Sequence, residues 1–409
     1  MKKTVTILVL LLFILSLSFY LINREADPVE PPVELSEPEE LKELSFSVKD
    51  FSFDLFPRLA EDDKNIFISP YSIHTALVMA YRGAGEESAK EMSEVLGLTD
   101  MELETLMKNS LGLKQYLEHF SKENEVAIAN ALFLRDDIPF LSSYKTDAER
   151  YFEGKIDPLP DTGEIVNDWV FENTREKIDK IIDPGPIDYD VIAYLVNAIY
   201  FQGVWAEEFD ENNTEKRPFY GTGGEVEVDM MENESDYLFA VSENMKSVTI
   251  EYKDGDYLFH AFMPTDDRAL SEFYVDFDRE TFDLMKPTSN EEIVLRIPKF
   301  TMEDEFKLVD VLKGMGMELV FEESLADFSE MVDLDAIGLN VFISDILHAS
   351  FIEVDEKGTE AAAATAVEMK LESASLPPTV VEFNRPFLFL IEEPETGTIL
   401  FMGHLANLE

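Results

Sequence analysis

The chain has 409 residues, 45% of them hydrophobic, which is enough apolar side chain to fill a sizeable core. Its 33 basic and 85 acidic residues give a formal net charge of -52, which excludes nucleic acid and anionic membrane surfaces as partners because both would be repelled. The absence of cysteine excludes disulfides, thiol catalysis and thiolate metal sites. An acidic excess of this size predicts a halophilic protein, because high salt screens the self-repulsion of the folded chain.

The N-terminal segment, residues 1–24, is predicted to be a signal peptide or a membrane anchor. Lys2 and Lys3 precede an uncharged, mostly apolar run over residues 4–22, which is close to the length that spans a bilayer. Basic residues before this run and acidic sequence after it predict that the rest of the chain is exported. We therefore expect a protein that is extracellular or tethered to the outer face of the cell membrane, with membrane contact through this segment only.

Two further regions follow this segment. Residues 25–44 are rich in proline and glutamate with little to bury, so they predict an extended acidic tether. Residues 45–409 contain no linker or repeat and are expected to form one domain. The first helical pattern of that domain, FSFDLFPRLA, contains Pro57, which removes a backbone donor and predicts a kinked or shortened helix.

The segment NIFISPYSIHTALVMAYRGAGEES, from Asn65, predicts a short strand followed by a helix. Ser69 is placed to cap that helix and Pro70 suits its first turn. The continuously apolar YLVNAIYFQGVW, from Tyr194, is typical of a central strand, whereas the alternation in IVLRIPKF, from Ile293, predicts a half-buried strand.

The C-terminal sequence FLFLIEEPETGTILFMGHL, from Phe387, predicts a hairpin whose loop is the six-residue EEPETG. Helical patterns gather early in the domain and strand patterns gather late, without regular alternation. This arrangement predicts an α+β fold with a large central mixed β-sheet.

The segment VDEKGTEAAAATAVEMKLES, from Val354, is alanine-rich, but its polar pattern has a period of two. Charged side chains stand at even positions: Glu360, Glu368, Lys370 and Glu372. From Thr359 onward the odd positions are uncharged: Thr359, Ala361, Ala363, Thr365, Val367, Met369 and Leu371. A period of two belongs to a strand with one buried face rather than to a helix.

Motifs of common enzymes are absent from the sequence. None of the five histidines stands at the spacing of a metal site, and no nucleophile elbow, phosphate-binding loop or dinucleotide fingerprint is present. We therefore expect no metal, no cofactor and no catalytic residue. An exported hydrolase built from distant residues stays open as an alternative.

The segment EKGTEAAAATA, from Glu356, resembles the hinge of the reactive-centre loop in inhibitory serpins. Other serpin-like segments follow one another in the family order over residues 45–409: NIFISPYSI, ANALFLRDDI, VNDWVFENTREKI, LVNAIYFQGVW, VDMM, IPKF, HASFIEVDEKGTEA, EFNRPFLFLI and FMGHL. The resemblance implies the serpin fold, with additional sheets, a helical subdomain and an exposed reactive-centre loop over about 356–378. It also implies a suicide inhibitor, not an enzyme.

In the mechanism that this resemblance implies, a serine protease attacks the loop as bait and forms an acyl-enzyme. The loop then inserts as a strand into the main sheet and traps the protease in a covalent complex. The implied hinge residues are Glu356, Gly358, Thr359, Ala361, Ala362, Ala363 and Ala364. The implied residues that control opening of the sheet are Ser69, Ser72, Asn197, Trp205 and His348.

The bond that the resemblance implies as bait is Glu372–Ser373. Counting from the other end of the loop lands nearer Ala374 or Ser375, so Ala374 stays open as an alternative. Lys370 and Leu371 stay open as well, because a loop can offer more than one usable bond. The matching proteases are accordingly Glu-specific, trypsin-like, or chymotrypsin- or subtilisin-like, and the inhibitor is expected to be a monomer. The alternative function is a non-inhibitory serpin that acts as a chaperone, a carrier or a protease substrate.

Overall fold

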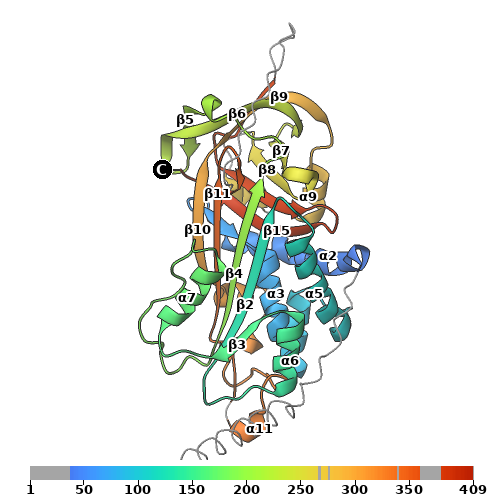
Figure 1. Ribbon diagram of the computed structural model, residues 1–409, viewed down its shortest axis with the longest axis vertical. Helices are drawn as coiled ribbons and strands as arrows, with labels where there is room; N and C mark the ends of the chain where they lie inside the picture. The colour runs from blue at the N-terminus through green and yellow to red at the C-terminus, as the bar shows by residue number, and fades with distance from the viewer. Residues whose placement is uncertain (1–36, 266–268, 275–276, 339, 360–378, 409) are drawn as a thin grey trace, which may run out of the picture. The chain divides into compact units, whose positions relative to one another are not determined.

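The computed structural model describes residues 37–265, 269–274, 277–338, 340–359 and 379–408. A six-stranded sheet runs through the molecule in the order β10-β11-β12-β4-β2-β3. Its strands are β2 (Glu125–Leu134), β3 (Lys155–Pro158), β4 (Ala193–Val204), β10 (Phe300–Lys307), β11 (Asp345–Val354) and β12 (Gly358–Thr359). The sheet is mixed, because β11 is parallel to β4 and β2 to β3 while the other pairs are antiparallel. Figure 1 shows the long strands of this sheet side by side.

A nine-stranded sheet has the order β1-β15-β14-β8-β7-β6-β9-β13, with β5 paired to β6. Its strands are β1 (Ile66–Ile68), β5 (Glu215–Gly221), β6 (Gly224–Val241), β7 (Met245–Glu251), β8 (Leu258–Pro264), β9 (Asn290–Pro298), β13 (Thr379–Glu382), β14 (Phe387–Glu393) and β15 (Thr398–Leu405). The central strand, the strand from Ile293 and the hairpin strands expected from the sequence are confirmed as β4, β9 and the β14–β15 pair. Strand β9 is not half-buried over the predicted stretch, because Val294 and Pro298 are buried as well as the alternate residues.

The α-helices of the described residues are α2 (Pro38–Leu59), α3 (Pro70–Tyr81), α4 (Glu86–Val95), α5 (Leu103–His119), α6 (Ser142–Tyr151), α7 (Gly163–Asn173), α8 (Leu270–Tyr274), α9 (Arg279–Met285), α10 (Val309–Gly314) and α11 (Leu334–Ile337). Three 3-10 turns are η1 (Glu211–Asn213), η2 (Lys253–Gly255) and η3 (Leu319–Phe321). The predicted cap of α3 is confirmed, because Ser69 Oγ accepts the N–H of Ser72 at 3.2 Å.

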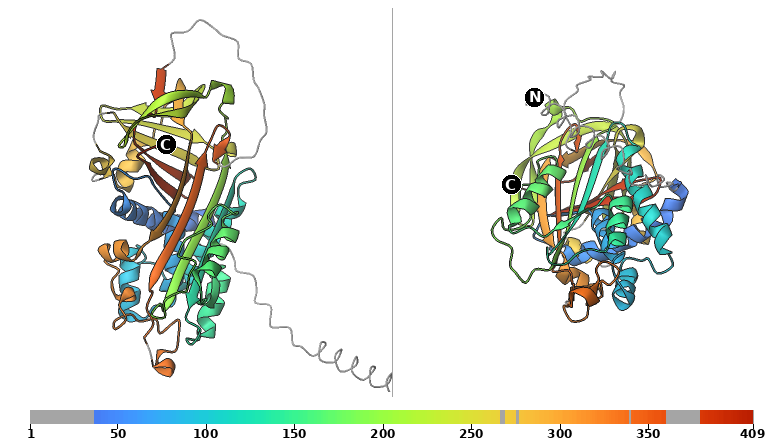
Figure 2. Two further views of the ribbon diagram at one scale, coloured as in Figure 1. Left: turned by 90° about the vertical axis from the view of Figure 1, so that its left-hand side faces the viewer. Right: turned by 60° about the horizontal axis from the view of Figure 1, so that its bottom comes forward.

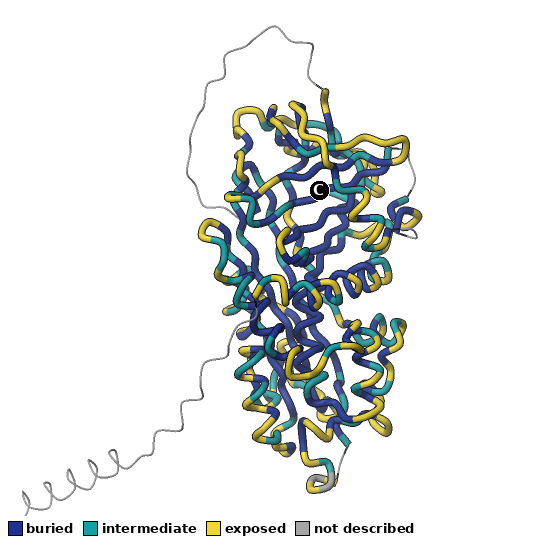
Figure 3. The backbone as a smooth tube through the Cα atoms, turned by 90° about the vertical axis from the view of Figure 1, so that its right-hand side faces the viewer, coloured by how far each residue is buried: buried dark blue, intermediate teal, exposed yellow. Residues whose placement is uncertain are grey.

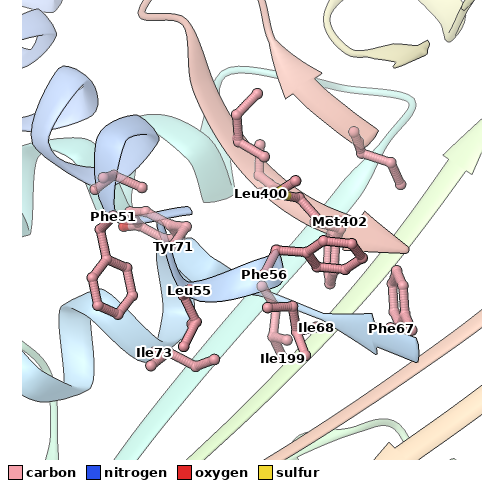
Figure 4. Packing of buried hydrophobic residues seen from close by; sticks show 14 of the residues in the cluster. Phe51, Leu55, Phe56, Phe67, Ile68, Tyr71, Ile73, Ile199, Leu400 and Met402 are labelled. Carbon is pink, nitrogen blue, oxygen red and sulfur yellow. The ribbon is translucent and has the colours of Figure 1, made fainter. Parts of the chain in front are cut away.

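The main core lies between the two sheets and is built around α2 and α3. Phe56 of α2, Tyr71 of α3, Phe67 of β1 and Met402 of β15 all belong to this core and are labelled in Figure 4. The face of β4 that points to α3 carries Ile199, which belongs to the same core. Figure 3 shows that the strands of both sheets are largely buried, whereas exposed residues gather on helices and turns. Burial of these apolar side chains is the main source of stability of the fold.

A second, separate apolar cluster lies on the opposite face of the six-stranded sheet, under α7. Alternate residues of a strand point to opposite faces, so Val196 of β4 points to α7 while Ile199 points to α3. Trp169 of α7 packs in this cluster with residues of both β4 and β11. The side view in Figure 2 shows α7 and α3 on the two sides of the sheet.

Three further expectations from the sequence are wrong: the length of the tether, the shortening of the first helix at Pro57 and the length of the hairpin loop. Helix α2 begins at Pro38, so residues 38–44 are not an extended tether; Leu41 and Leu44 share a helix face and are buried in the core. This helix also continues through Pro57 to Leu59. The loop of the C-terminal hairpin is the four residues 394–397 rather than six, because the two glutamates before it belong to β14.

The glutamates at the end of β14 can be buried because polar partners surround them. The Glu392 carboxylate lies 3.3 Å from Lys49 Nζ, 3.0 Å from Lys286 Nζ and 3.0 Å from His260 Nε2. Burial alone would raise the pKa of Glu392, but these neighbours outweigh it and lower that pKa to about 2. A sequence pattern alone does not reveal such distant partners.

Candidate functional site: the parted end of the six-stranded sheet

Strands β11 and β4 touch along only part of their length. Residues 345–350 of β11 pair directly with residues 194–199 of β4. Beyond this point β12 lies between the two strands, and Thr359 pairs with Val354 on one side and Gly203 on the other. The sheet is therefore already parted at one end, and the first residues of the segment expected to be a loop occupy the opening.

A tight turn reverses the chain between β11 and β12. Asp355 N donates to Gly358 O at 2.9 Å, and Asp355 Oδ1 accepts the N–H groups of Lys357 and Gly358 at 2.8 and 3.2 Å. Gly358 has a φ of 157°, and a Cβ there would lie 1.9 Å from the carbonyl oxygen of Gly203. Only glycine fits at this position because the backbones approach too closely for any side chain.

Thr359 is buried between the strands and is held by a hydrogen bond. Its Oγ1 lies 2.6 Å from the hydroxyl of Tyr252, whose ring stacks on Trp205 at a centroid distance of 4.5 Å. The indole of Trp205 donates to Asp355 O at 2.9 Å, and its backbone N–H donates to Lys357 O at 2.9 Å. Trp205 thus holds the turn from both its side chain and its backbone, and Tyr252 fixes the residue that follows.

Glu356 connects the turn to two other elements. Its carboxylate accepts from Lys299 Nζ at 2.6 Å and from Thr214 Oγ1 at 2.7 Å, and its carbonyl accepts from Phe209 N at 2.7 Å. Burial raises the pKa of Glu356, but the hydrogen bonds from Lys299 and Thr214 outweigh burial, so the pKa lies below its ordinary value. The carboxylate therefore stays charged and paired at neutral pH.

A buried polar cluster lies where β11 and β4 are still joined. His348 and Asn197 are direct partners across these strands, and His348 Nδ1 lies 2.7 Å from Asn197 Oδ1. His348 Nε2 accepts the N–H of Ser69 at 3.1 Å, which leaves the proton of the neutral ring on Nδ1. Asn197 Nδ2 donates to Ser72 Oγ and, at 2.7 Å, to Asn130 Oδ1. Burial lowers the pKa of His348 to about 3, so the ring is neutral at physiological pH.

The structure thus brings the sequence-derived residues into two groups. Glu356, Gly358, Thr359 and Trp205 meet at the parted end, and Ser69, Ser72, Asn197 and His348 meet where the strands join. The remaining sequence-derived positions lie outside the described residues: Ala361, Ala362, Ala363, Ala364, Lys370, Leu371, Glu372, Ser373 and Ala374. The N-terminal segment, residues 1–24, lies outside them too.

Several residues of the site were not found from the sequence. Tyr252, Lys299 and Thr214 lie far along the chain from the turn that they contact, and no local pattern marks them. Asn130 was also missed, although an asparagine within the apolar strand ANALFL is an unusual polar residue in a strand of the core. A polar residue at a buried strand position needs a partner, and this requirement was the available signal.

Two observations concern metals and membranes. In residues 37–265, 269–274, 277–338, 340–359 and 379–408, no group of three or more histidine, aspartate or glutamate side chains is arranged to hold a metal ion. Over the same part of the chain, every helix is too short or too polar to cross a bilayer.

Comparison with known proteins places this geometry in a family. A family model described as "Serpin (serine protease inhibitor)" matches residues 46–408. Iris of Ixodes ricinus is 34% identical over 381 residues, which cover 89% of this chain and 99% of that protein. A crystal structure of the thermophilic serpin Tengpin in the native state has a TM-score of 0.83 and 28% identity, covering 92% of this chain and 97% of that one. Human thyroxine-binding globulin in complex with thyroxine has a TM-score of 0.81 and 28% identity, covering 90% and 99%. The chain belongs to the serpin family.

Proposed function

We propose that this serpin is a suicide inhibitor of serine endopeptidases. The observation that carries the proposal is the position of Thr359 between β11 and β4, in an opening as wide as one strand. A loop that starts inside the sheet can continue to insert along the same seam. The uncharged odd positions from Thr359 to Leu371 supply the face that such a strand would bury.

The chemistry belongs to the protease. Its serine Oγ attacks the carbonyl carbon of the residue before the bait bond, for which we propose Glu372, and forms an ester with it. The new amino group at Ser373 leaves with the C-terminal peptide. Insertion of the loop up to the ester then carries the protease away before water can hydrolyse it. Lys370, Leu371 and Ala374 are the alternative positions for the attacked carbonyl.

Insertion must break the joint between β11 and β4. The facing residues 345–350 and 194–199 must separate, and with them the hydrogen bond between His348 and Asn197. The ladder of backbone hydrogen bonds between β11 and β4 would be lost, but the new strand would form one ladder with β11 and another with β4. The inserted form would therefore be lower in free energy. The native form is then metastable, held by the polar cluster around His348.

The second candidate is a carrier that does not inhibit. It is favoured by the similarity to thyroxine-binding globulin, which binds thyroxine in the compared structure. A carrier that does not insert its loop would not require glycine at position 358, nor uncharged residues at alternate positions after it. We therefore place inhibition first.

We also propose that the protein acts outside the cell and in high salt. The apolar run before the acidic chain supports export, either by a cleaved signal peptide or with residues 1–24 as an anchor. The net charge of -52 supports a high-salt environment.

The test is to incubate the chain from Glu25 with trypsin-, chymotrypsin-, subtilisin- and glutamate-specific proteases in high salt, followed by denaturing gels. We expect a band that survives denaturation at the summed mass of both proteins less the C-terminal peptide. Mass spectrometry of that peptide identifies the bait bond. Loop cleavage without such a band, and without a rise in thermal stability after cleavage, would contradict inhibition by insertion.

A further inference from the structure

Strand β10 has a strand neighbour on one side only in the described part of the chain, where it pairs with β11. Leu308 N donates to Ile346 O at 3.0 Å, which fixes the alternation of the antiparallel ladder. Even-numbered residues of β10 therefore direct their backbone groups at β11. Thr301, Glu303 and Glu305 direct their N–H and C=O groups at the open edge, and their side chains are exposed or partly exposed.

A groove of about 730 Å³ runs along this edge. Its residues are Asp63, Lys64, Asn65, Lys299, Phe300, Thr301, Met302, Glu303, Asp304, Glu353, Val354, Asp355, Asn407 and Leu408. Six of them, 299–304, are consecutive. Five of these six belong to β10, and Glu353 and Val354 belong to its partner β11, so the groove lies at the start of β10 and touches both faces of that strand. We call it the edge groove.

The far wall of the edge groove is fixed by its own hydrogen bonds. Asn65 Oδ1 accepts the N–H of Asn407 at 2.9 Å, and Asn65 Nδ2 donates to Asn407 O at 2.9 Å. Asn407 Nδ2 donates to Asp63 O at 2.9 Å. The floor contains the buried side chains of Phe300 and Met302. The groove is therefore a built feature with one wall that offers free strand hydrogen bonds.

The charge of the edge groove is strongly negative. Its two lysines are each paired with a carboxylate outside the lining, Lys64 with Glu61 at 2.8 Å and Lys299 with Glu356 at 2.6 Å. Five lining carboxylates form no ion pair with any described residue: Asp63, Glu303, Asp304, Glu353 and Asp355. Burial raises the pKa of Asp304 to about 7, so this carboxyl group is only partly ionised at neutral pH and the other four carry most of the negative charge. The lining therefore offers no unpaired lysine to balance these carboxylates.

We propose that the edge groove binds an extended basic peptide segment, which pairs its backbone with β10 as an added strand and sets lysine or arginine side chains against the lining carboxylates. Addition of a strand to an open sheet edge is a general mode of peptide recognition, in which the backbone supplies affinity and the side chains supply specificity. The segment belongs to another protein. Another copy of this chain, at a net charge of -52, and its own residues 25–36, which hold acids and no base, would both be repelled.

The test uses a fluorescent hexapeptide of alternating valine and lysine, and measures anisotropy with the full chain both at low salt and at the high salt proposed for this protein, because screening weakens exposed charge contacts. Its controls are the same peptide with glutamate for lysine, and a peptide N-methylated at alternate residues so that it keeps its charge but cannot pair as a strand. We expect saturable binding of the lysine peptide, about tenfold weaker binding after N-methylation because two net hydrogen bonds are lost, and no binding of the glutamate peptide.

Variants test the same contact from the protein side. Thr301→Pro removes one outward N–H at an edge position, where proline does not interrupt the ladder to β11, and we expect a loss of about threefold. Thr301→Val keeps the N–H and is the matched control. Glu353→Lys should also weaken the lysine peptide. Equal binding of the methylated peptide would overturn strand addition, and absence of saturable binding of the lysine peptide at millimolar concentration would overturn the site.

Discussion

The hydroxyl groups of Thr359 and Tyr252 lie 2.6 Å apart inside the parted end of the sheet. Tyr252 directly follows β7 of the nine-stranded sheet, whereas Thr359 lies in the six-stranded sheet. A single buried hydrogen bond thus links the start of the reactive-centre loop to the second sheet.

This link can be measured with a double-mutant cycle. Tyr252→Phe leaves the buried Thr359 hydroxyl without its partner, so we expect the free energy of unfolding to fall by about 1–2 kcal/mol. Thr359→Val should cost a similar amount, and the double variant should cost less than the sum, because the second change removes the group left unpaired by the first. Midpoints of urea unfolding give the three values. Strict additivity would mean that the two hydroxyls do not interact.

Gly358→Ala should expel β12 from the sheet. The added Cβ would lie 1.9 Å from Gly203 O, a contact that neither backbone can relieve without moving apart. We expect the amides of β12 and of the facing end of β4 to lose protection in hydrogen exchange. Gly314→Ala in α10 is the matched control, because no atom lies within 4 Å of the point that a Cβ would occupy there. Unchanged protection in Gly358→Ala would contradict the close approach.

The acid dependence of stability should change in His348→Gln. Burial lowers the pKa of His348 to about 3 from 6.5, so the unfolded chain binds a proton below pH 6.5 that the folded chain refuses. The lowered pKa of His348 makes its full contribution to the free energy of unfolding above pH 6.5. That contribution is lost as the pH falls toward 3, by up to about 1.4 kcal/mol per pH unit. We expect His348→Gln to reduce the slope of unfolding free energy against pH by that amount.

The comparison is between His348→Gln and the unchanged protein over the same pH range. The other buried histidines, His74, His260 and His404, are present in both proteins and cancel in the comparison. Identical slopes for His348→Gln and the unchanged protein would remove His348 as a buried neutral group.

Thr365→Arg should convert the inhibitor into a substrate; Thr359 is unsuitable for this test because it already lies between β11 and β4 before insertion. Insertion would bury an unpaired guanidinium between β11 and β4, at a cost of several kcal/mol, so hydrolysis of the ester would win the competition. We expect more inhibitor to be consumed for each protease molecule trapped, measured as the stoichiometry of inhibition. Thr146→Arg on the exposed surface of α6 makes the same chemical change away from the seam and should leave the stoichiometry unaltered. The same stoichiometry in both variants would contradict insertion.

The sequence predicted the parts of the site that depend on local periodicity. The period of two in the loop placed Thr359 on a buried face, and the structure buries it. Ser69 was recognised as a helix cap because capping needs only a residue type at a helix start. Tyr252 and Lys299 could not be predicted in this way, since their contacts with the turn arise from the packing of strands distant in sequence.

The same distinction explains the errors at the ends of elements. The sequence pattern assigned Glu392 and Glu393 to the loop because charged residues rarely enter a buried strand. For Glu392, Lys49 of α2 and Lys286 at the end of α9 make burial possible. Residues 38–44 read as tether because proline and glutamate dominate their composition. Leu41 and Leu44, three residues apart on one face of α2, are nevertheless buried, and they pack residues 38–44 against the core.

Helix α7 straddles the seam that the proposed insertion would open. The apolar cluster beneath it contains Val196 and Ala198 of β4 together with their direct cross-strand partners, Leu347 and Ala349 of β11. An added strand would move these two strands apart by about 4.8 Å, and one helix could not keep both sets of contacts. The proposed insertion therefore requires α7 to give up its contacts with at least one of the two strands while the new strand enters.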